Sequence, residues 1–175
     1  VHMCNSAATL RFPEAHFDLV RPGIMTYGLI PYRGSSDTLV LEPVLSLKSK
    51  ISFIKDVSAG TSISYGSTFI TKRPSRLATV PIGYADGFNR RMSNRGKGIV
   101  NGNAVPVAGR ITMDQTVFDI TDAGEVSVGD TITLIGTDGD KTITVEDHAH
   151  IAETISHEIV TGITGRVSRA VTPPA

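Results

Sequence analysis

From about Leu39 onwards, short runs of β-type residues alternate with turn-forming residues. Asn101-Gly102-Asn103 and Asp138-Gly139-Asp140 are hairpin signals, because Asn-Gly and Asp-Gly pairs suit tight turns. Short strands at regular spacing predict a mostly β fold, as a compact barrel or sandwich. The expected strands are Val40–Lys55, Ser62–Ile70, Leu77–Ile82, Lys97–Val100, Ala104–Ala108, Thr116–Ile120 and Thr131–Ile135.

A single helical stretch is expected near the C-terminus. Residues Val145–Ile163 show helical character, and Thr144 is placed to cap their first turn. A last strand is expected near Arg166–Val171.

Residues 1–35 have a different pattern. A helix or helical turn is expected to begin near Ser6. Val1–Cys4 suits the interior of a strand, and Ile24–Ile30 suits a buried strand. A short helix leading into a buried strand is typical of the last units of a parallel α/β barrel. We therefore expect residues 1–35 to be the last segment of a TIM-type α/β barrel and residues 36–175 to form a β domain. The abrupt start of the chain suggests a fragment.

Composition excludes several kinds of partner. Lys plus Arg and Asp plus Glu both number 17 in 175 residues, so no net charge favours nucleic acid or an anionic membrane. No apolar run approaches the roughly 18 residues that span a bilayer. Cys4 is the only cysteine, which excludes an internal disulfide and fits a reducing cytoplasm. His148 and His150 are two residues apart and do not share a helix face, so no metal site is expected.

Four segments carry candidate chemistry. Each also has a plainer interpretation: an ion pair for Arg21, a strand tyrosine for Tyr65, a turn for Asp86-Gly87 and core filling for Met113. Ser6, which lies outside these segments, has a plainer interpretation as a helix cap. The four segments are Arg21-Pro22-Gly23-Ile24, Ser64-Tyr65-Gly66, Pro81-Ile82-Gly83-Tyr84-Ala85-Asp86-Gly87 and Gly109-Arg110-Ile111-Thr112-Met113-Asp114.

In order and spacing, these segments resemble the alanine racemase family, whose members use pyridoxal phosphate (PLP) and interconvert L- and D-alanine for cell-wall precursors. The resemblance implies the family layout of an α/β barrel followed by a mostly β domain. It also implies a homodimer, in which one subunit's tyrosine enters the other's active site.

The resemblance assigns roles to eight residues. Tyr65 would be a catalytic acid/base that serves one face of the substrate. Arg21, supported by His2, would donate a hydrogen bond to the PLP ring nitrogen, because arginine keeps its proton. A neutral ring nitrogen suits racemisation and disfavours transamination. Ser6, Gly23 and Ile24 would bind the PLP phosphate. The Met113 backbone N–H would bind the substrate carboxylate, and Tyr84 would line the route by which the substrate enters.

Some family features are missing or altered. No lysine of this chain lies in a setting like that of the PLP-binding lysine, and the barrel arginine that grips the substrate carboxylate is absent. Gly165 stands where several family members have a phosphate-contacting tyrosine, and Ser168 stands where proline is usual. We therefore expect the isolated chain to be inactive. The alternatives are a serine or broad-specificity amino-acid racemase of the same fold, and a non-catalytic β-barrel interaction module with Tyr65 unexposed.

Overall fold

The computed structural model describes residues 1–31 and 40–172. The chain divides into two compact units, Val1–Leu45 and Ser46–Ala175. The predicted domain boundary, between residues 35 and 36, lies outside the described residues.

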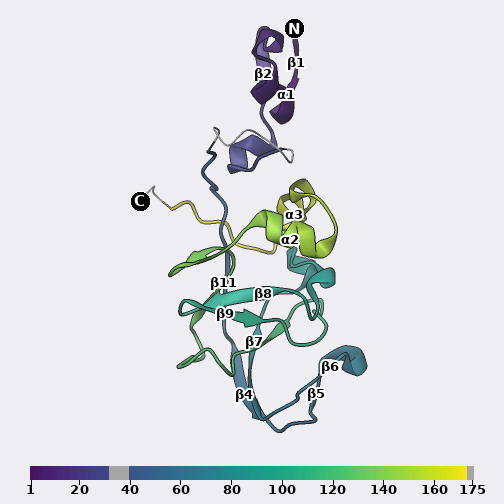
Figure 1. Ribbon diagram of the computed structural model, residues 1–175, viewed down its shortest axis with the longest axis vertical. Coiled ribbons are helices and arrows are strands. Elements are labelled where there is room, and N and C mark those ends of the chain that lie inside the picture. Colours follow the sequence, from purple (N-terminus) through teal and green to yellow (C-terminus); the bar gives the residue numbers. More distant parts are fainter. Residues whose placement is uncertain (32–39, 173–175) are drawn as a thin grey trace. The chain divides into compact units, whose positions relative to one another are not determined.

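In the N-terminal unit, a short helix connects two parallel strands (Figure 1). Strand β1 (His2–Asn5) pairs with β2 (Leu19–Arg21), and helix α1 (Ser6–Arg11) lies between them in sequence. Parallel strands require a crossover connection, usually a helix. This β-α-β arrangement is what the end of a parallel α/β barrel contains. The 3-10 helices η1 (Pro13–Ala15) and η2 (Ile24–Tyr27) complete the unit.

Two details of this unit differ from expectation. The helix cap is Asn5, whose side chain accepts a hydrogen bond from the Ala8 N–H at 3.0 Å, while Ser6 is the first helical residue and is buried. Residues Ile24–Ile30 were expected to be a strand, which is wrong, since Ile24–Tyr27 form η2 and Gly28 ends it with φ 72°. Periodicity alone cannot separate a short buried strand from a helical turn of the same apolar residues.

The C-terminal unit is built from antiparallel sheets, which confirms the mostly β prediction (Figure 1). One sheet has the strand order β10-β7-β4, and another has the order β12-β11-β8-β9 with β3 also paired to β11. A bridge between Val107 and Phe118 links the end of β9 to β10. The strands are β3 (Leu47–Lys50), β4 (Phe53–Val57), β5 (Ser62–Ile63), β6 (Phe69–Ile70), β7 (Ser75–Val80), β8 (Lys97–Val100), β9 (Asn103–Pro106), β10 (Thr116–Asp119), β11 (Thr131–Asp138) and β12 (Lys141–Ile143).

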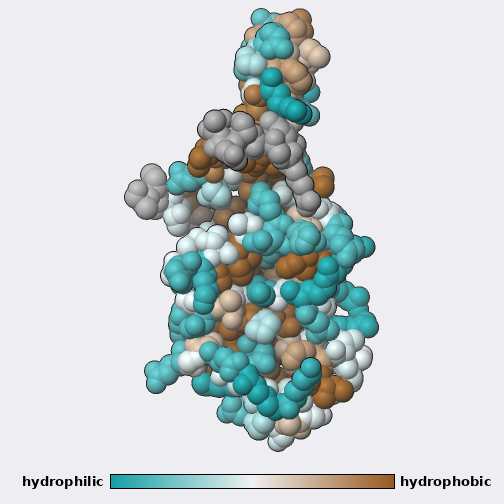
Figure 2. Space-filling model, in the orientation of Figure 1, coloured by the Kyte–Doolittle hydropathy of each residue, from teal (hydrophilic) through white to brown (hydrophobic). Residues whose placement is uncertain are grey.

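The core of this unit contains large apolar side chains from both sheets. Phe88, Phe118, Ile132 and Leu134 are fully buried. Hydrophilic residues cover most of the face shown in Figure 2, with apolar residues in smaller groups between them. No helix among residues 1–31 and 40–172 combines the length and apolar character that crossing a membrane requires.

Four predicted elements of the β region are wrong in part. Val40–Lys55 was expected to be one strand, but residues 40–46 form none and the rest contains two strands, β3 and β4. Ser62–Ile70 is a hairpin, in which β5 and β6 flank the 3-10 turn η3 (Tyr65–Ser67). The expected long helix is two helices, α2 (Val145–Ala152) and α3 (Ser156–Gly162), because Glu153 adopts a left-handed conformation with φ 57°. Residues 166–171 form no strand.

Other expectations are confirmed. The strand Lys97–Val100 has the predicted bounds. Thr144 caps α2, since its hydroxyl accepts a hydrogen bond from the Asp147 N–H at 3.0 Å. The Asp138-Gly139-Asp140 turn connects β11 to β12, a strand that the sequence pattern did not reveal.

His148 of α2 is a buried ionisable group in this core. It is 3% exposed, its ring meets Phe88 edge-on at 5.6 Å, and its Nε2 has no hydrogen-bond partner among the described residues. Burial lowers the pKa of His148 from 6.5 to about 4, and a backbone hydrogen bond at Leu134 and the charge of Asp147 oppose this shift only in part. The folded protein therefore holds His148 neutral.

We predict that His148 makes the fold less stable in mild acid. The unfolded chain takes up a proton at pH values below 6.5, whereas the folded chain does so only near pH 4. Stability is therefore complete above the unfolded pKa and falls by about 3 kcal/mol as the pH drops towards the folded pKa. Urea unfolding between pH 7 and about pH 4 measures this loss.

The variant His148→Leu should lose most of this pH dependence, because it has nothing to protonate. His150→Leu, which alters an exposed histidine of the same helix, should keep it. An unchanged pH profile in His148→Leu would contradict the assignment.

Candidate active site

Tyr65 stands on a tight turn at the tip of the β5–β6 hairpin. Ser64, Gly66 and Ser67 have φ values of 61°, 71° and 50°, so left-handed conformations lie on both sides of the tyrosine. The Tyr65 side chain is 73% exposed. The turn thus presents a phenol to solvent. A tyrosine within a continuous strand would instead pack against its sheet.

Two sets of hydrogen bonds tie this turn to the Gly109–Arg110 backbone. The Ser64 hydroxyl donates to the Arg110 carbonyl at 2.6 Å. Asn94 donates through Nδ2 to the Thr68 hydroxyl at 3.1 Å, and its Oδ1 accepts from the Gly109 N–H at 2.7 Å. The turn is therefore fastened on both sides of Tyr65.

Two exposed guanidinium groups, those of Arg90 and Arg110, accompany the tyrosine. The Arg110 side chain lies over Gly66, where a Cβ would be 3.5 Å from its Nε. Within the described ranges, neither guanidinium is recorded in an ion pair or side-chain hydrogen bond. Permanent cations with free donors suit the binding of an anionic group such as a carboxylate.

Tyr84 and Met113 are joined through their backbones. The Tyr84 N–H donates to the Thr112 carbonyl at 3.1 Å, and the Ala85 N–H donates to the Met113 carbonyl at 3.0 Å. A Cβ on Gly83 would lie only 2.3 Å from each of these two carbonyl oxygens. Only glycine therefore allows the 3-10 helix η4 (Tyr84–Asp86) to approach the Met113 loop this closely.

The Met113 N–H is available for a ligand, since among the described residues no acceptor is recorded for it. Its side chain is 52% exposed, so Met113 does not fill the core.

These residues surround one surface cavity of about 360 Å³ in the C-terminal unit. Tyr65, Tyr84 and Met113, which the family resemblance singled out, all line it. The other lining residues are Arg90, Arg110, Ile111, Thr112 and Asp114. The cavity thus offers two phenols, two cations and a backbone donor, a set that can bind a carboxylate and exchange a proton.

A second candidate group lies in the N-terminal unit. The Arg21 guanidinium is 2.6 Å from His2 Nδ1, and its other terminal nitrogen donates to the Met3 carbonyl at 3.4 Å. In the parallel pairing of β1 with β2, Arg21 lies opposite Asn5 and His2 lies opposite Leu19, so the Arg21 side chain reaches back along β1 to His2. The contact with His2 holds the Arg21 guanidinium, while the supporting role of His2 at a PLP ring stays a prediction.

Ser6, Gly23 and Ile24 meet at the start of η2. The buried Ser6 Oγ accepts from the Met25 N–H at 3.4 Å, which leaves its hydroxyl proton to donate. The Gly23 N–H already donates to the Arg21 carbonyl at 2.9 Å, whereas no acceptor is recorded for the Ile24 N–H in the described part of the chain. A Cβ on Gly23 would meet nothing within 4 Å. Open space beside two free donors fits a phosphate group.

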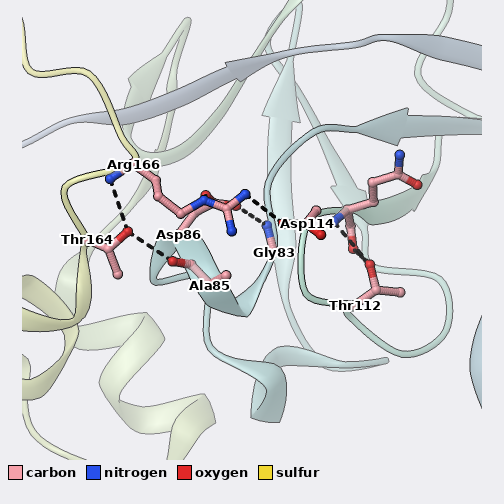
Figure 3. Close-up of polar contacts among 8 residues, drawn as sticks. Gly83, Ala85, Asp86, Thr112, Asp114, Thr164 and Arg166 are labelled. Atoms are coloured by element: carbon pink, nitrogen blue, oxygen red, sulfur yellow. Dashed lines mark hydrogen bonds and ion pairs between the residues drawn. The ribbon is translucent and has the colours of Figure 1, made fainter.

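Two features of the site escaped the sequence analysis. Arg90 carried no local signal, and neither did the pairing of Arg166 with Asp86 and Asp114 (Figure 3). The space around Gly165 does not require a glycine, because a Cβ there would meet nothing within 4 Å. No group of His, Cys, Asp or Glu side chains suited to a metal ion was found among residues 1–31 and 40–172.

Comparisons with known proteins identify the family of the chain. The alanine racemase C-terminal domain matches residues 44–171, and the alanine racemase N-terminal domain matches residues 1–31. The alanine racemase of Halothermothrix orenii is 48% identical over 168 residues, which are 96% of this chain and 44% of that protein. That of Carboxydothermus hydrogenoformans is 46% identical over 169 residues, 96% of this chain and 46% of that protein.

Solved structures give the same result. The alanine racemase of Bacillus anthracis with bound L-Ala-P matches with a TM-score of 0.89 at 46% identity, over 95% of this chain and 43% of that one. The alanine racemase of D-cycloserine-producing Streptomyces lavendulae gives 0.90 at 42% identity, over 99% of this chain and 46% of that one.

Fold and sequence together define a racemase-type β domain with a short segment of the preceding domain. The chain belongs to the alanine racemase family, an isomerase family that uses PLP. It spans less than half the length of the curated relatives it matches.

Substitution of Gly83 should push η4, which carries Tyr84, away from the Met113 loop. Gly83→Ala places a methyl group against two backbone carbonyls that cannot turn away. We expect a loss of about 1–3 kcal/mol in unfolding free energy, typical of overpacking. Gly162→Ala is the matched control, because nothing lies within 4 Å of its Cβ and it ends helix α3. Equal stability of the two variants in urea unfolding would contradict the close approach.

Proposed function

We propose that this chain is part of an alanine racemase, an enzyme that interconverts L- and D-alanine for cell-wall precursors. The observation that carries the proposal is the shared cavity of Tyr65, Tyr84 and Met113. The curated relatives named above, at 46–48% identity, are alanine racemases. A cytoplasmic location is proposed from the single unpaired cysteine, Cys4.

The N-terminal unit would hold the cofactor. When bound, PLP makes the α-proton of an amino acid more acidic. Arg21, held by His2, would donate a hydrogen bond to the ring nitrogen and, because a guanidinium keeps its proton, would leave that nitrogen neutral. The Ser6 hydroxyl and the Ile24 N–H would donate to the phosphate, beside the space that Gly23 leaves open.

Tyr65 would act as the acid/base on one face of the substrate. Its phenolate oxygen takes the α-proton from L-alanine, and in the opposite direction the phenol returns a proton to the same face. A racemase needs a second acid/base on the opposite face, which in the family is the lysine that carries PLP. Because that lysine is outside this chain, the chain alone should be inactive.

The remaining cavity residues would bind the substrate. The Met113 N–H would donate to the substrate carboxylate, and Tyr84 would limit the space beside it. Exposure of Tyr65 suits a homodimer in which it enters the partner subunit's active site.

The alternatives fit less well. A non-catalytic module would leave Tyr65 unexposed and the three residues apart, whereas Tyr65 is 73% exposed and all three line one cavity. A serine or broad-specificity racemase would use the same residues, and alanine is preferred because the matched relatives are alanine racemases.

Replacing Tyr65 tests the proposal in a complete enzyme that contains this chain. Tyr65→Phe should slow exchange of the α-proton of L-alanine by about 10²–10⁴-fold, the usual contribution of a general base. Exchange from D-alanine should fall much less, since that proton leaves from the other face. Isotope exchange with solvent, measured separately for each enantiomer, gives both rates.

Tyr84→Phe is the matched control, because it removes a phenol oxygen from the same cavity without removing the proposed base. It should affect both enantiomers alike. Equal losses in Tyr65→Phe, or no loss at all, would show that Tyr65 is not the base for one face.

A further inference from the structure

Arg166 joins the two backbone segments that carry Tyr84 and Met113 (Figure 3). Its Nε lies 3.2 Å from Asp86 Oδ1, and a terminal nitrogen donates to Asp114 Oδ1 at 2.6 Å. Asp86 lies two residues after Tyr84, and Asp114 directly follows Met113. One guanidinium thus binds a carboxylate from each segment, although Arg166 itself does not line the cavity.

The backbone next to Arg166 is fastened to the same place. The Thr164 hydroxyl donates to the Ala85 carbonyl at 2.9 Å, and the Thr164 N–H donates to the Asp86 carbonyl at 3.3 Å. The Asp86 side chain, in turn, accepts from the Gly83 N–H at 2.8 Å. Arg166 is therefore anchored on η4 and extends from there to the Met113 loop.

This linkage bears on the direction of the Met113 N–H. The peptide between Thr112 and Met113 is planar, with its C=O and N–H on opposite sides. Its carbonyl accepts from the Tyr84 N–H at 3.1 Å, so η4 fixes where the Met113 N–H points. Any shift of η4 against the loop rotates this donor.

We propose that Arg166 is a positioning residue for substrate binding, which sets the Met113 N–H by holding Asp86 and Asp114 together. This inference rests on the proposed function, in which that N–H receives the substrate carboxylate. Arg166 stays charged throughout the working pH range, since its hydrogen bond to Asp114 and the nearby charge of Asp86 raise its pKa further.

The test compares variants of the complete holoenzyme. Arg166→Met removes both carboxylate contacts, and Arg166→Lys keeps the charge but can pair with one carboxylate at a time. Arg169→Met is the matched control. Arg169 is an exposed arginine three residues after Arg166, and its side chain donates to the Ile163 carbonyl and contacts neither carboxylate. For each protein, KM and kcat for both alanine enantiomers are measured, with thermal unfolding and the inhibition constant of propionate, which carries the same carboxylate without the amino group.

In Arg166→Met, KM for alanine and the inhibition constant of propionate should rise together by about tenfold, the scale of one misdirected hydrogen bond. The change in kcat should be smaller, because the proton-transfer residues are untouched. Arg166→Lys should fall between Arg166→Met and the unsubstituted enzyme, and Arg169→Met should match the latter. Unchanged KM and propionate inhibition in Arg166→Met, or loss of thermal stability with no change in either, would overturn the proposal.

Asp114→Asn keeps the test decisive if Arg166→Met does not fold. It removes one carboxylate, leaves the Asp86 contact intact, and should raise the same two constants by a smaller factor. Constants equal to those of the unsubstituted enzyme would again overturn the positioning role. If the unsubstituted enzyme does not racemise alanine, the proposed function itself fails, which is a separate result.

Discussion

The arrangement of the cavity depends on the backbone from Arg110 to Asp114, to which two otherwise separate turns are bonded. At one end, the Arg110 carbonyl accepts from Ser64 beside Tyr65. Further along, the Thr112 and Met113 carbonyls accept from η4, which carries Tyr84. Bonded backbone groups keep fixed directions more reliably than side chains alone. The cavity residues therefore hold their relative positions because one loop determines all of them.

The candidate chemistry is divided between the two units of the chain. The C-terminal unit supplies two phenols, two cations and a backbone donor. The N-terminal unit supplies the Arg21–His2 pair and the donors around Ser6. The family comparisons cover both units, yet the chain spans less than half of each curated relative named. The proposed reaction therefore needs groups from outside this chain.

Local patterns in the sequence predicted local structure well. Lys97–Val100 and the Thr144 cap depend on neighbouring residues, and both were predicted. The Ser62–Ile70 segment was taken as one strand, because its β-type residues hide a turn that requires three left-handed conformations. The helix break at Glu153 was missed because it also depends on a left-handed residue that the sequence pattern does not reveal.

Long-range contacts explain what the sequence could not show about the site. The resemblance named Tyr65, Tyr84 and Met113, but Arg166 contacts Asp114 across 52 positions of the chain, and no spacing rule links them. Arg90 was missed because its importance comes only from its place beside the cavity. Sequence motifs thus identified candidate chemical groups, while the structure identified what holds them.

Backbone strain beside Tyr65 is the last link between fold and proposed function. Ser64, with φ 61° and ψ −175°, occupies a region that is essentially restricted to glycine and costs about 1–3 kcal/mol. Such a conformation persists only where surrounding contacts require it, and here the 2.6 Å bond from its own hydroxyl to Arg110 supplies one. A continuous strand would avoid this cost but would pack Tyr65 against the sheet. The strained turn therefore trades local stability for an exposed phenol on a fastened backbone, which suits the acid/base role proposed for Tyr65.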